Sequence, residues 1–201
     1  MVSTMTRTPS TLDRRAAVAA LLEDRGNTLV VSGLGSTTYD CNAAGDQPAN
    51  FYLWGAMGGA TMIGLGLALA QPARPVWVIT GDGEQLMGLG SLATVAVQSP
   101  SNLRIVVIDN SHYAETGLQK SHTAYGVDLC AVARGCGFQQ VLEVSDLAGV
   151  RELRRALRES GQGPMLGVVR VKPENPPRSL PSRDAVYLKN RFRAHLGLPQ
   201  G

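Results

Sequence analysis

The residues most suggestive of chemistry form the tripeptide Gly81-Asp82-Gly83, an aspartate placed between two glycines. It follows residues 76–80, an uncharged stretch rich in β-branched side chains that predicts a buried strand. The glycines let a ligand approach the backbone closely, and a helix that begins just beyond them directs free N–H groups at an anion. A carboxylate beside such an anion is best explained by a divalent cation that bridges the two.

A second oxygen ligand for this cation is expected at the end of the neighbouring strand. Asn110 directly follows the strand-like residues 103–109, and 26 residues (84–109) separate it from Gly83. Because the carboxyl ends of parallel strands lie at one edge of a sheet, Asp82 and Asn110 should meet there. The amide oxygen of an asparagine suits Mg²⁺ or Ca²⁺. Gly-Asp-Gly alone also fits an ordinary strand-to-helix turn, but the pair of motifs favours a metal site.

Alternating helices and strands must position these groups. Periodicity and breaker residues predict helices over 11–25, 58–70, 85–98, 127–136, 146–160 and 184–195, and strands over 28–32, 76–80, 103–109, 140–144 and 165–171. Residues 33–50 and 110–126 are expected to be polar loops. Uncharged strands between helices indicate the α/β class, with a single doubly wound parallel sheet and helices on both faces.

Composition and charge narrow the classes of function. The chain has 201 residues and a net charge of only +3, which gives no argument for nucleic-acid binding. Its three cysteines show no CxxC spacing, so neither a disulfide framework nor a zinc site is expected, and a cytoplasmic location is the default. The N-terminal residues 1–15 lack the apolar core of a signal peptide. Residues 54–70 are apolar but short and glycine-rich, which favours a buried helix over a membrane span.

The motifs together resemble the thiamine diphosphate signature, in which Gly-Asp-Gly precedes an asparagine at this spacing. The resemblance spans about residues 28–171 and includes Gly55-Ala56-Met57-Gly58 and the Gly-Leu-Gly-Ser turn at 33–36. The chain is most similar to the diphosphate-binding (PP) domain of thiamine-diphosphate-dependent enzymes, and within them to the beta subunits of sulfopyruvate and phosphonopyruvate decarboxylases. Residues 109–119 carry that closer likeness. This implies a PP domain over 1–171 and a Pro-rich linker with a basic, docked tail helix over 172–201.

The resemblance implies roles for individual residues. Asp82 and Asn110 would bind Mg²⁺ through their side chains, and His112 through its backbone carbonyl. Met57 would hold the cofactor in a bent conformation, although a core methionine that fills a gap is the alternative. The residues implied to bind thiamine diphosphate are Gly35, Ser36, Thr37, Gly55, Met57, Gly81, Gly83, Glu84 and Tyr113.

Substrate-facing groups are expected on the loop after residue 109. His112, Glu115 and His122 are the candidates for catalysis, although a surface or packing role is an equal alternative for either histidine. Two positions depart from the family pattern. Glu84 stands where a small residue is usual, and its carboxylate would repel a diphosphate unless it turns away or pairs. Asp109 replaces an asparagine and is expected to orient the loop without touching the metal.

The implied function is the cofactor-binding subunit of a heteromeric 2-oxo acid decarboxylase, a carboxy-lyase acting on a sulfopyruvate- or phosphonopyruvate-like substrate. The family's activating glutamate belongs to a Pyr domain, for which this chain has no room. A Pyr-domain subunit on a separate chain is therefore expected, in a heterotetramer or larger assembly, with residues 51–70 and the tail as contact regions. The alternatives are a subunit of a carboligase or 2-oxo acid oxidoreductase, or a non-catalytic binding subunit. A Rossmann dinucleotide site is disfavoured because residues 33–38 do not form GxGxxG.

Overall fold

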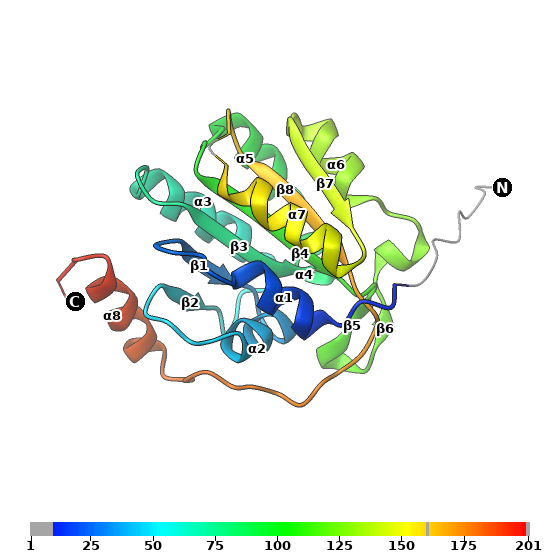
Figure 1. Ribbon diagram of the computed structural model, residues 1–201, viewed down its shortest axis with the longest axis horizontal. Coiled ribbons are helices and arrows are strands. Elements are labelled where there is room, and N and C mark those ends of the chain that lie inside the picture. Colours follow the sequence, from blue (N-terminus) through cyan, green and yellow to red (C-terminus); the bar gives the residue numbers. More distant parts are fainter. Residues whose placement is uncertain (1–9, 160, 200–201) are drawn as a thin grey trace.

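Six parallel strands form one sheet, and its topology confirms the α/β class (Figure 1). The structure, a computed structural model, describes residues 10–159 and 161–199. The strand order is β2-β1-β3-β4-β8-β7. The strands are β1 (Leu29–Ser32), β2 (Asn50–Tyr52), β3 (Val76–Gly81), β4 (Leu103–Asp109), β7 (Gln140–Val144) and β8 (Met165–Arg170). Residues 1–9, 160, 200 and 201 of the expected domain, helix and tail lie outside the described residues.

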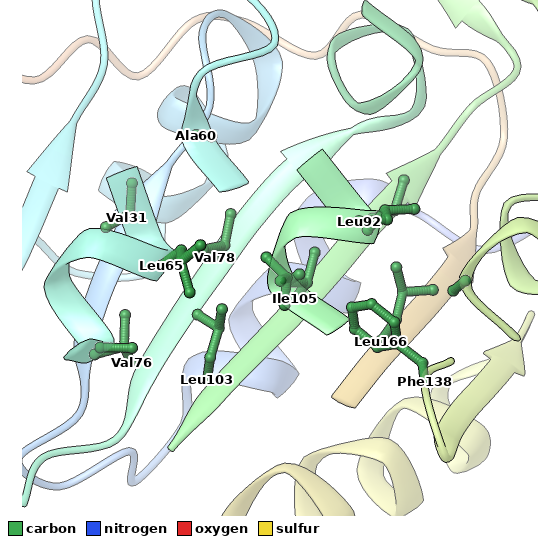
Figure 2. Packing of buried hydrophobic residues seen from close by; sticks show 14 of the residues in the cluster. Val31, Ala60, Leu65, Val76, Val78, Leu92, Leu103, Ile105, Phe138 and Leu166 are labelled. Carbon is green, nitrogen blue, oxygen red and sulfur yellow. The ribbon is translucent and has the colours of Figure 1, made fainter. Parts of the chain in front are cut away.

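Helices cover both faces of the sheet, as doubly wound topology requires. One face carries α1 (Arg14–Leu22), α2 (Ser36–Ala43) and α7 (Leu147–Arg158). The other carries α3 (Ala60–Ala70), α5 (Ser91–Gln98) and α6 (Leu129–Cys136), whose side chains pack on strand residues such as Val78 and Ile105 (Figure 2). Alternate residues of each central strand contribute to the two clusters, so both faces of the strands are mainly apolar.

Helix α8 (Ala185–His195) packs along the β2 edge, so the expected tail helix is present. Leu188 belongs to the apolar cluster on one face and Phe192 to that on the other. The rings of Phe51 and Phe192 lie 5.4 Å apart between centroids. The tail thus covers an edge strand that would otherwise expose unpaired backbone groups. The division of the chain into a domain and a tail at residue 171 stays a prediction.

The prediction of a loop over residues 33–50 was wrong. Helix α2 occupies Ser36–Ala43, and β2 begins at Asn50. The sequence of α2, STTYDCNA, has almost no helical hydrophobic pattern. Contacts with α1 and β1 hold this segment in place, so tertiary packing overrides local preference here.

The prediction of one helix over residues 85–98 was also wrong. The segment forms α4 (Asp82–Met87) and α5 (Ser91–Gln98), and the helix starts at Asp82 itself. The break lies where Gly88 meets Gly58, since a Cβ on Gly88 would stand 2.2 Å from the carbonyl oxygen of Gly58. Two bare glycines therefore bring the two chain segments into direct backbone contact.

The expected loop over 110–126 contains ordered structure. It forms the short antiparallel pair β5 (His112–Tyr113) and β6 (Gln119–Lys120). Two 3₁₀ turns, η1 (Ala114–Thr116) and η2 (His122–Tyr125), accompany the pair. This segment therefore presents its polar side chains from a defined scaffold at the carboxyl edge of the sheet.

Helix α3 is buried on one face only. A Cβ on Gly64 would lie 2.2 Å from Cγ2 of Val78, so the expected glycine-mediated packing is present. On the outer face, the side chains of Met62, Ile63 and Leu69 are 42%, 36% and 51% exposed. Among the described residues, no helix has the length and apolar character needed to cross a bilayer. The outer side of α3 thus presents apolar side chains that the described residues leave exposed.

Two glycines of α3 provide a matched test of this packing. Gly64→Ala should lower the free energy of unfolding by about 1–3 kcal/mol because the added methyl group overlaps Val78. Gly66→Ala should raise it by about 0.5–1 kcal/mol, since nothing lies within 4 Å of the added carbon and alanine favours the helix. Urea denaturation of both variants measures the difference. Effects of the same sign would contradict the packing described.

Candidate functional site

A cavity of about 250 Å³ opens at the carboxyl ends of β3 and β4. We call it the strand-end cavity. Its walls come from the start of α2, the start of α4 and the segment around β5, as expected for a site at the end of a parallel sheet. The predicted site residues that line it are Ser36, Thr37, Met57, Gly81, Asp82, Gly83, Glu84, Asn110, His112, Tyr113 and Glu115.

Three predicted site residues do not line the strand-end cavity. Gly35 sits behind the wall with a φ of +81°, and a Cβ there would meet Cγ of Glu115 at 2.8 Å. Gly55 and His122 are exposed and lie outside the lining. Their roles in binding and catalysis stay predictions. Lining residues that the sequence did not indicate are Arg14, Leu34, Met87, Ile108, Ala114 and Thr116.

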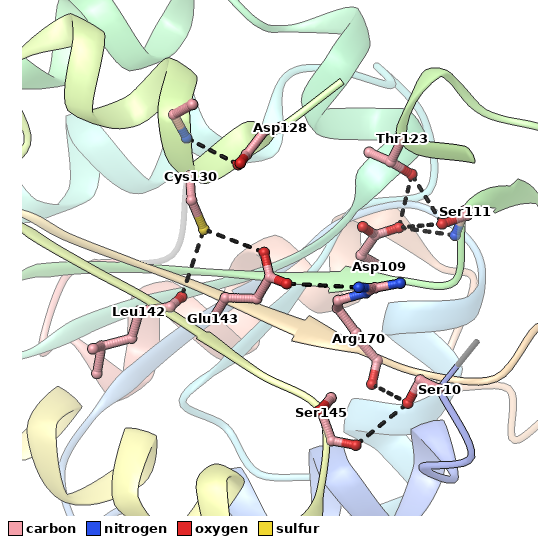
Figure 3. A network of polar contacts seen from close by, with 11 residues as sticks. Ser10, Asp109, Ser111, Thr123, Asp128, Cys130, Leu142, Glu143, Ser145 and Arg170 are labelled. Carbon is pink, nitrogen blue, oxygen red and sulfur yellow. Dashed lines mark hydrogen bonds and ion pairs between the residues drawn. The ribbon is translucent and has the colours of Figure 1, made fainter. Parts of the chain in front are cut away.

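Asp82 is the first residue of α4, and its side chain is held by hydroxyl groups. It is 2% exposed. Its Oδ2 accepts hydrogen bonds from Ser121 Oγ at 2.5 Å and from Thr123 Oγ1 at 3.3 Å. Thr123 also lies 2.9 Å from Oδ1 of Asp109 (Figure 3), so its single hydroxyl proton serves one carboxylate at a time. Two hydroxyl side chains from η2 and its N-cap therefore orient Asp82, and nothing in the sequence marked them.

Burial raises the pKa of Asp82 to about 7, and the nearby charge of Asp109 adds to the effect. The hydroxyls of Ser121 and Thr123 act in the opposite direction. An ionised Asp82 is therefore costly in the absence of a cation. A bound divalent ion would remove that cost, which is the electrostatic property expected of a metal ligand.

Asn110 and His112 form a compact turn beside Asp82. Oδ1 of Asn110 accepts the backbone N–H of His112 at 2.9 Å and keeps a second lone pair free. The ring Nδ1 of His112 lies 2.8 Å from the carbonyl oxygen of Asn110, so Nδ1 carries the hydrogen and Nε2 is left as the acceptor. The donors available to a metal are thus carboxylate, amide and backbone oxygens. That set fits Mg²⁺ or Ca²⁺ and disfavours softer metals.

Glu84 turns away from the ligand space, which accounts for its presence beside the Gly-Asp-Gly turn. Its side chain is 3% exposed, and Oε2 accepts the hydroxyl of Thr80 at 3.0 Å. The carboxylate lies against Gly33, where a Cβ would stand 1.7 Å from Oε2. Burial raises the pKa of Glu84, while the Thr80 hydroxyl and backbone groups including that of Leu34 lower it. Only the backbone of Glu84 is left to meet an anion.

Two helix starts face the strand-end cavity. The first N–H groups of α2 and α4 have no partner within their own helix, which makes each start a site for an anion. The approach to α4 at Gly81 is open, since a Cβ built there would have no neighbouring atom within 4 Å. At Gly83 the ring of Tyr113 packs on the bare Cα, since a Cβ would lie 2.5 Å from its Cε1. The donors and the space together fit a diphosphate.

The rim of the cavity is held by a segment we call the C-terminal strap, residues 172–182. Glu115 accepts hydrogen bonds from Tyr39 Oη at 3.3 Å and from Arg178 Nη2 at 3.1 Å. The neighbouring strap residue, Pro177, accepts a hydrogen bond through its carbonyl from Arg15 of α1 at 2.8 Å. The strap runs from the β5–β6 region along α2 to α8 (Figure 1). Glu115 is thereby fixed by a residue more than 60 positions away.

The raised pKa of Asp82 predicts a pH-dependent stability. In buffer free of divalent cations, the free energy of unfolding of the wild-type chain should fall as the pH rises from about 4 to 7. The reason is that Asp82 has a higher pKa in the folded state than in the unfolded state, so its ionisation favours unfolding. Asp82→Asn removes this loss, so its advantage in the free energy of unfolding should grow by about 1–3 kcal/mol between pH 5 and pH 8. Denaturant titration at both pH values measures it.

The exposed Asp24 provides the matched control for this experiment. Asp24→Asn should show the wild-type dependence on pH. An advantage of Asp82→Asn that is equal at pH 5 and pH 8 would contradict the assignment of the raised pKa to Asp82.

Comparison with known proteins agrees with this geometry. Residues 33–169 match the family model described as "Thiamine pyrophosphate enzyme, C-terminal TPP binding domain". Over 175 residues the chain is 42% identical to the sulfopyruvate decarboxylase subunit beta of Methanothermobacter thermautotrophicus, covering 87% of this chain and 89% of that protein. It is 38% identical over 193 residues to the phosphonopyruvate decarboxylase of Streptomyces viridochromogenes, covering 92% of this chain and 47% of that one.

A solved structure shares the fold. The benzoylformate decarboxylase of Polynucleobacter necessarius superposes with a TM-score of 0.71 at 22% identity, over 85% of this chain and 36% of that chain. Since the family model matches well over half of the residues and contains both motifs of the strand-end cavity, the chain belongs to the family of C-terminal TPP-binding domains of thiamine pyrophosphate enzymes.

Proposed function

We propose that the chain is the cofactor-binding subunit of a heteromeric 2-oxo acid decarboxylase whose substrate carries an acidic head like that of sulfopyruvate or phosphonopyruvate. The observation that carries the proposal is the pairing of Asp82 and Asn110 in one cavity beside the bare Gly81–Gly83 turn. The named activities of the 42% and 38% identical relatives support the substrate class.

The cofactor is held from the pyrophosphate end. Asp82, Asn110 and the carbonyl of His112 would bind Mg²⁺, and the N–H groups at the starts of α2 and α4 would bind the diphosphate. The hydroxyl of Thr37 already donates to the carbonyl of Gly33 at 3.0 Å, so Thr37 contributes its backbone N–H. Ser36 remains as the hydroxyl donor. When bound, thiamine diphosphate supplies the electron sink for loss of CO₂ from a 2-oxo acid.

The rim residues have roles near the reacting end. Met57 lines the cavity while 41% exposed, and the preceding Ala56 has a φ of +56°. A strained backbone at a non-glycine residue is typical of a functional position, and here it would present Met57 to the cofactor. His112 and Glu115 line the cavity and are the residues proposed to move a proton near the substrate. His122 has weaker support, because it is exposed outside the lining.

A Pyr-domain partner on another chain completes the site in this proposal. The relative with 42% identity is named a subunit beta, which implies a partner subunit for that protein. Within the described residues there is one sheet of this size and no second α/β unit. Exposed apolar side chains lie in the cavity lining, at Met57 and Met87, and on α3, at Ile63. We assign this surface to the partner, in a cytoplasmic heterotetramer or larger assembly.

Related thiamine diphosphate reactions are the alternatives. A carboligase or a 2-oxo acid oxidoreductase would use the same cofactor site and differ in the product. A non-catalytic binding subunit is less well supported, because Glu84 is turned into the protein and leaves the diphosphate space free.

The assay of the complex tests this function. With Mg²⁺ and thiamine diphosphate, the chain and its partner should convert 3-sulfopyruvate or 3-phosphonopyruvate to CO₂ and the matching aldehyde. Asp82→Asn should weaken Mg²⁺-dependent cofactor binding about 100-fold, equivalent to about 2.7 kcal/mol, as measured by calorimetry. An acyloin product or a reduced electron acceptor would support the alternatives instead. Unchanged binding by Asp82→Asn would refute the metal site.

A charge on α3 tests the partner surface. Ile63→Asp should weaken assembly of the complex about tenfold or more, because an aspartate would be buried against the partner without a counter-charge. Leu147→Asp is the matched control, since Leu147 is 37% exposed against 36% for Ile63 but begins α7 on the opposite face. Native mass spectrometry over a dilution series reads out assembly. Equal effects of both substitutions would contradict the assignment.

A further inference from the structure

Arg14 is a basic residue in the wall of a cavity lined mainly by acidic and apolar groups. It is the first residue of α1, and its side chain is 4% exposed. The strand-end cavity is also lined by Asp82 and by Glu115, which is paired with Arg178, whereas the carboxylate of Glu84 is turned into the protein. A doubly or triply charged anion entering this space therefore needs positive charge beyond that of one divalent ion. Arg14 and the ring of His112 are the basic side chains in the described lining.

The guanidinium of Arg14 is held in place with one nitrogen left over. Nε donates to Oδ2 of Asp40 at 2.5 Å, and Nη1 donates to the carbonyl of Glu174 at 3.4 Å. Asp40 is fully buried, so the anchor is rigid. Within the part of the chain that the structure describes, Nη2 of Arg14 makes no hydrogen bond. It is the donor that remains for a ligand.

The charge of Arg14 is not cancelled by its anchor. Arg15 also donates to Asp40, from Nε to Oδ1 at 3.2 Å. Two guanidinium groups thus share one carboxylate, which leaves the group of three with a net charge of +1. Arg15 directs Nη2 at the carbonyl of Pro177 and does not line the cavity. The surplus charge is therefore available to a ligand only through Arg14.

We infer that Arg14 binds a tetrahedral oxyanion, a phosphoryl or sulfonyl oxygen, inside the strand-end cavity. An arginine fixed by a carboxylate presents planar N–H donors suited to such oxygens. Two sources share this chemistry, the diphosphate of the cofactor and the acidic head of the substrate. The inference rests on the proposed function and adds a recognition residue from α1 to it.

Arg14→Met and Arg15→Met, each assembled with the partner subunit, form the matched pair of variants. Calorimetry gives the Kd of thiamine diphosphate with Mg²⁺, and steady-state assays give KM for 3-sulfopyruvate or 3-phosphonopyruvate and for pyruvate, which lacks the acidic head. We expect Arg14→Met to change one of these about tenfold or more relative to Arg15→Met. The constants of Arg14→Lys should lie between those of the wild type and of Arg14→Met, because lysine keeps the positive charge but lacks the paired N–H donors of the guanidinium.

The two readouts separate the two sources. A weaker Kd for the cofactor identifies the diphosphate as the ligand of Arg14. An unchanged Kd with a raised KM only for the acidic 2-oxo acid identifies the substrate head. If Arg14→Met matches Arg15→Met in every constant, the pair with Asp40 is structural and the inference is overturned.

A second comparison guards against misfolding. Loss of Arg14 leaves the buried Asp40 with one counter-charge fewer, which destabilises the protein. The double variant Arg14→Met/Asp40→Asn removes that carboxylate, and it is compared with Asp40→Asn alone. If these two variants have the same Kd for thiamine diphosphate and the same KM for the acidic 2-oxo acid, the inference is overturned. If the wild-type complex itself fails to bind Mg²⁺ and thiamine diphosphate, the proposed function falls and the inference with it. Wild-type binding with no effect at Arg14 refutes the inference alone.

Discussion

Two carboxylates buried at the ends of adjacent parallel strands set the conditions for the rest of this site. Asp82 follows β3 and Asp109 is the last residue of β4, and the repulsion between their buried carboxylates is costly. The fold offsets part of that cost with hydroxyl groups from Ser121 and Thr123. The ordered segment after β4 is therefore more than a connection, because it carries the groups that keep a charged strand end compatible with folding. In the proposed site, a bound cation would offset the rest of that cost.

The sheet could be predicted largely from the sequence. The bounds of β4 and β7 agree with the expected ranges, because short runs rich in β-branched and aliphatic residues between helices favour strands. The meeting of Asp82 and Asn110 followed from the rule that parallel strands end at one edge. β2 has three residues, too few for a periodic signal, and α2 is stabilised by its neighbours rather than by its own pattern. The break before α5 depends on a contact with Gly58 that local sequence cannot show.

The site was predictable only where it depends on backbone position. The helical pattern of α1 indicates which face is buried, but it does not show that Arg14 turns toward the strand ends and meets Asp40, 26 positions away. The contact between Ser121 and Asp82 spans 39 positions, and no pattern in the sequence indicates it. The sequence suggested that Glu84 would repel an anion, because it does not show the contacts with Thr80 and Gly33 that turn the carboxylate into the protein. Distant partners decide the direction of each of these side chains.

The C-terminal strap has a consequence for the order in which the protein is made. β8 lies between β4 and β7, and the strap that follows it supplies Arg178 to Glu115 and a carbonyl to Arg14. A chain emerging from the ribosome folds its N-terminal parts first. The sheet therefore stays divided until β8 arrives, and the rim of the cavity closes only after the strap has emerged. The binding site is therefore completed only after residues 172–182 have emerged, well after the proposed metal ligands Asp82 and Asn110.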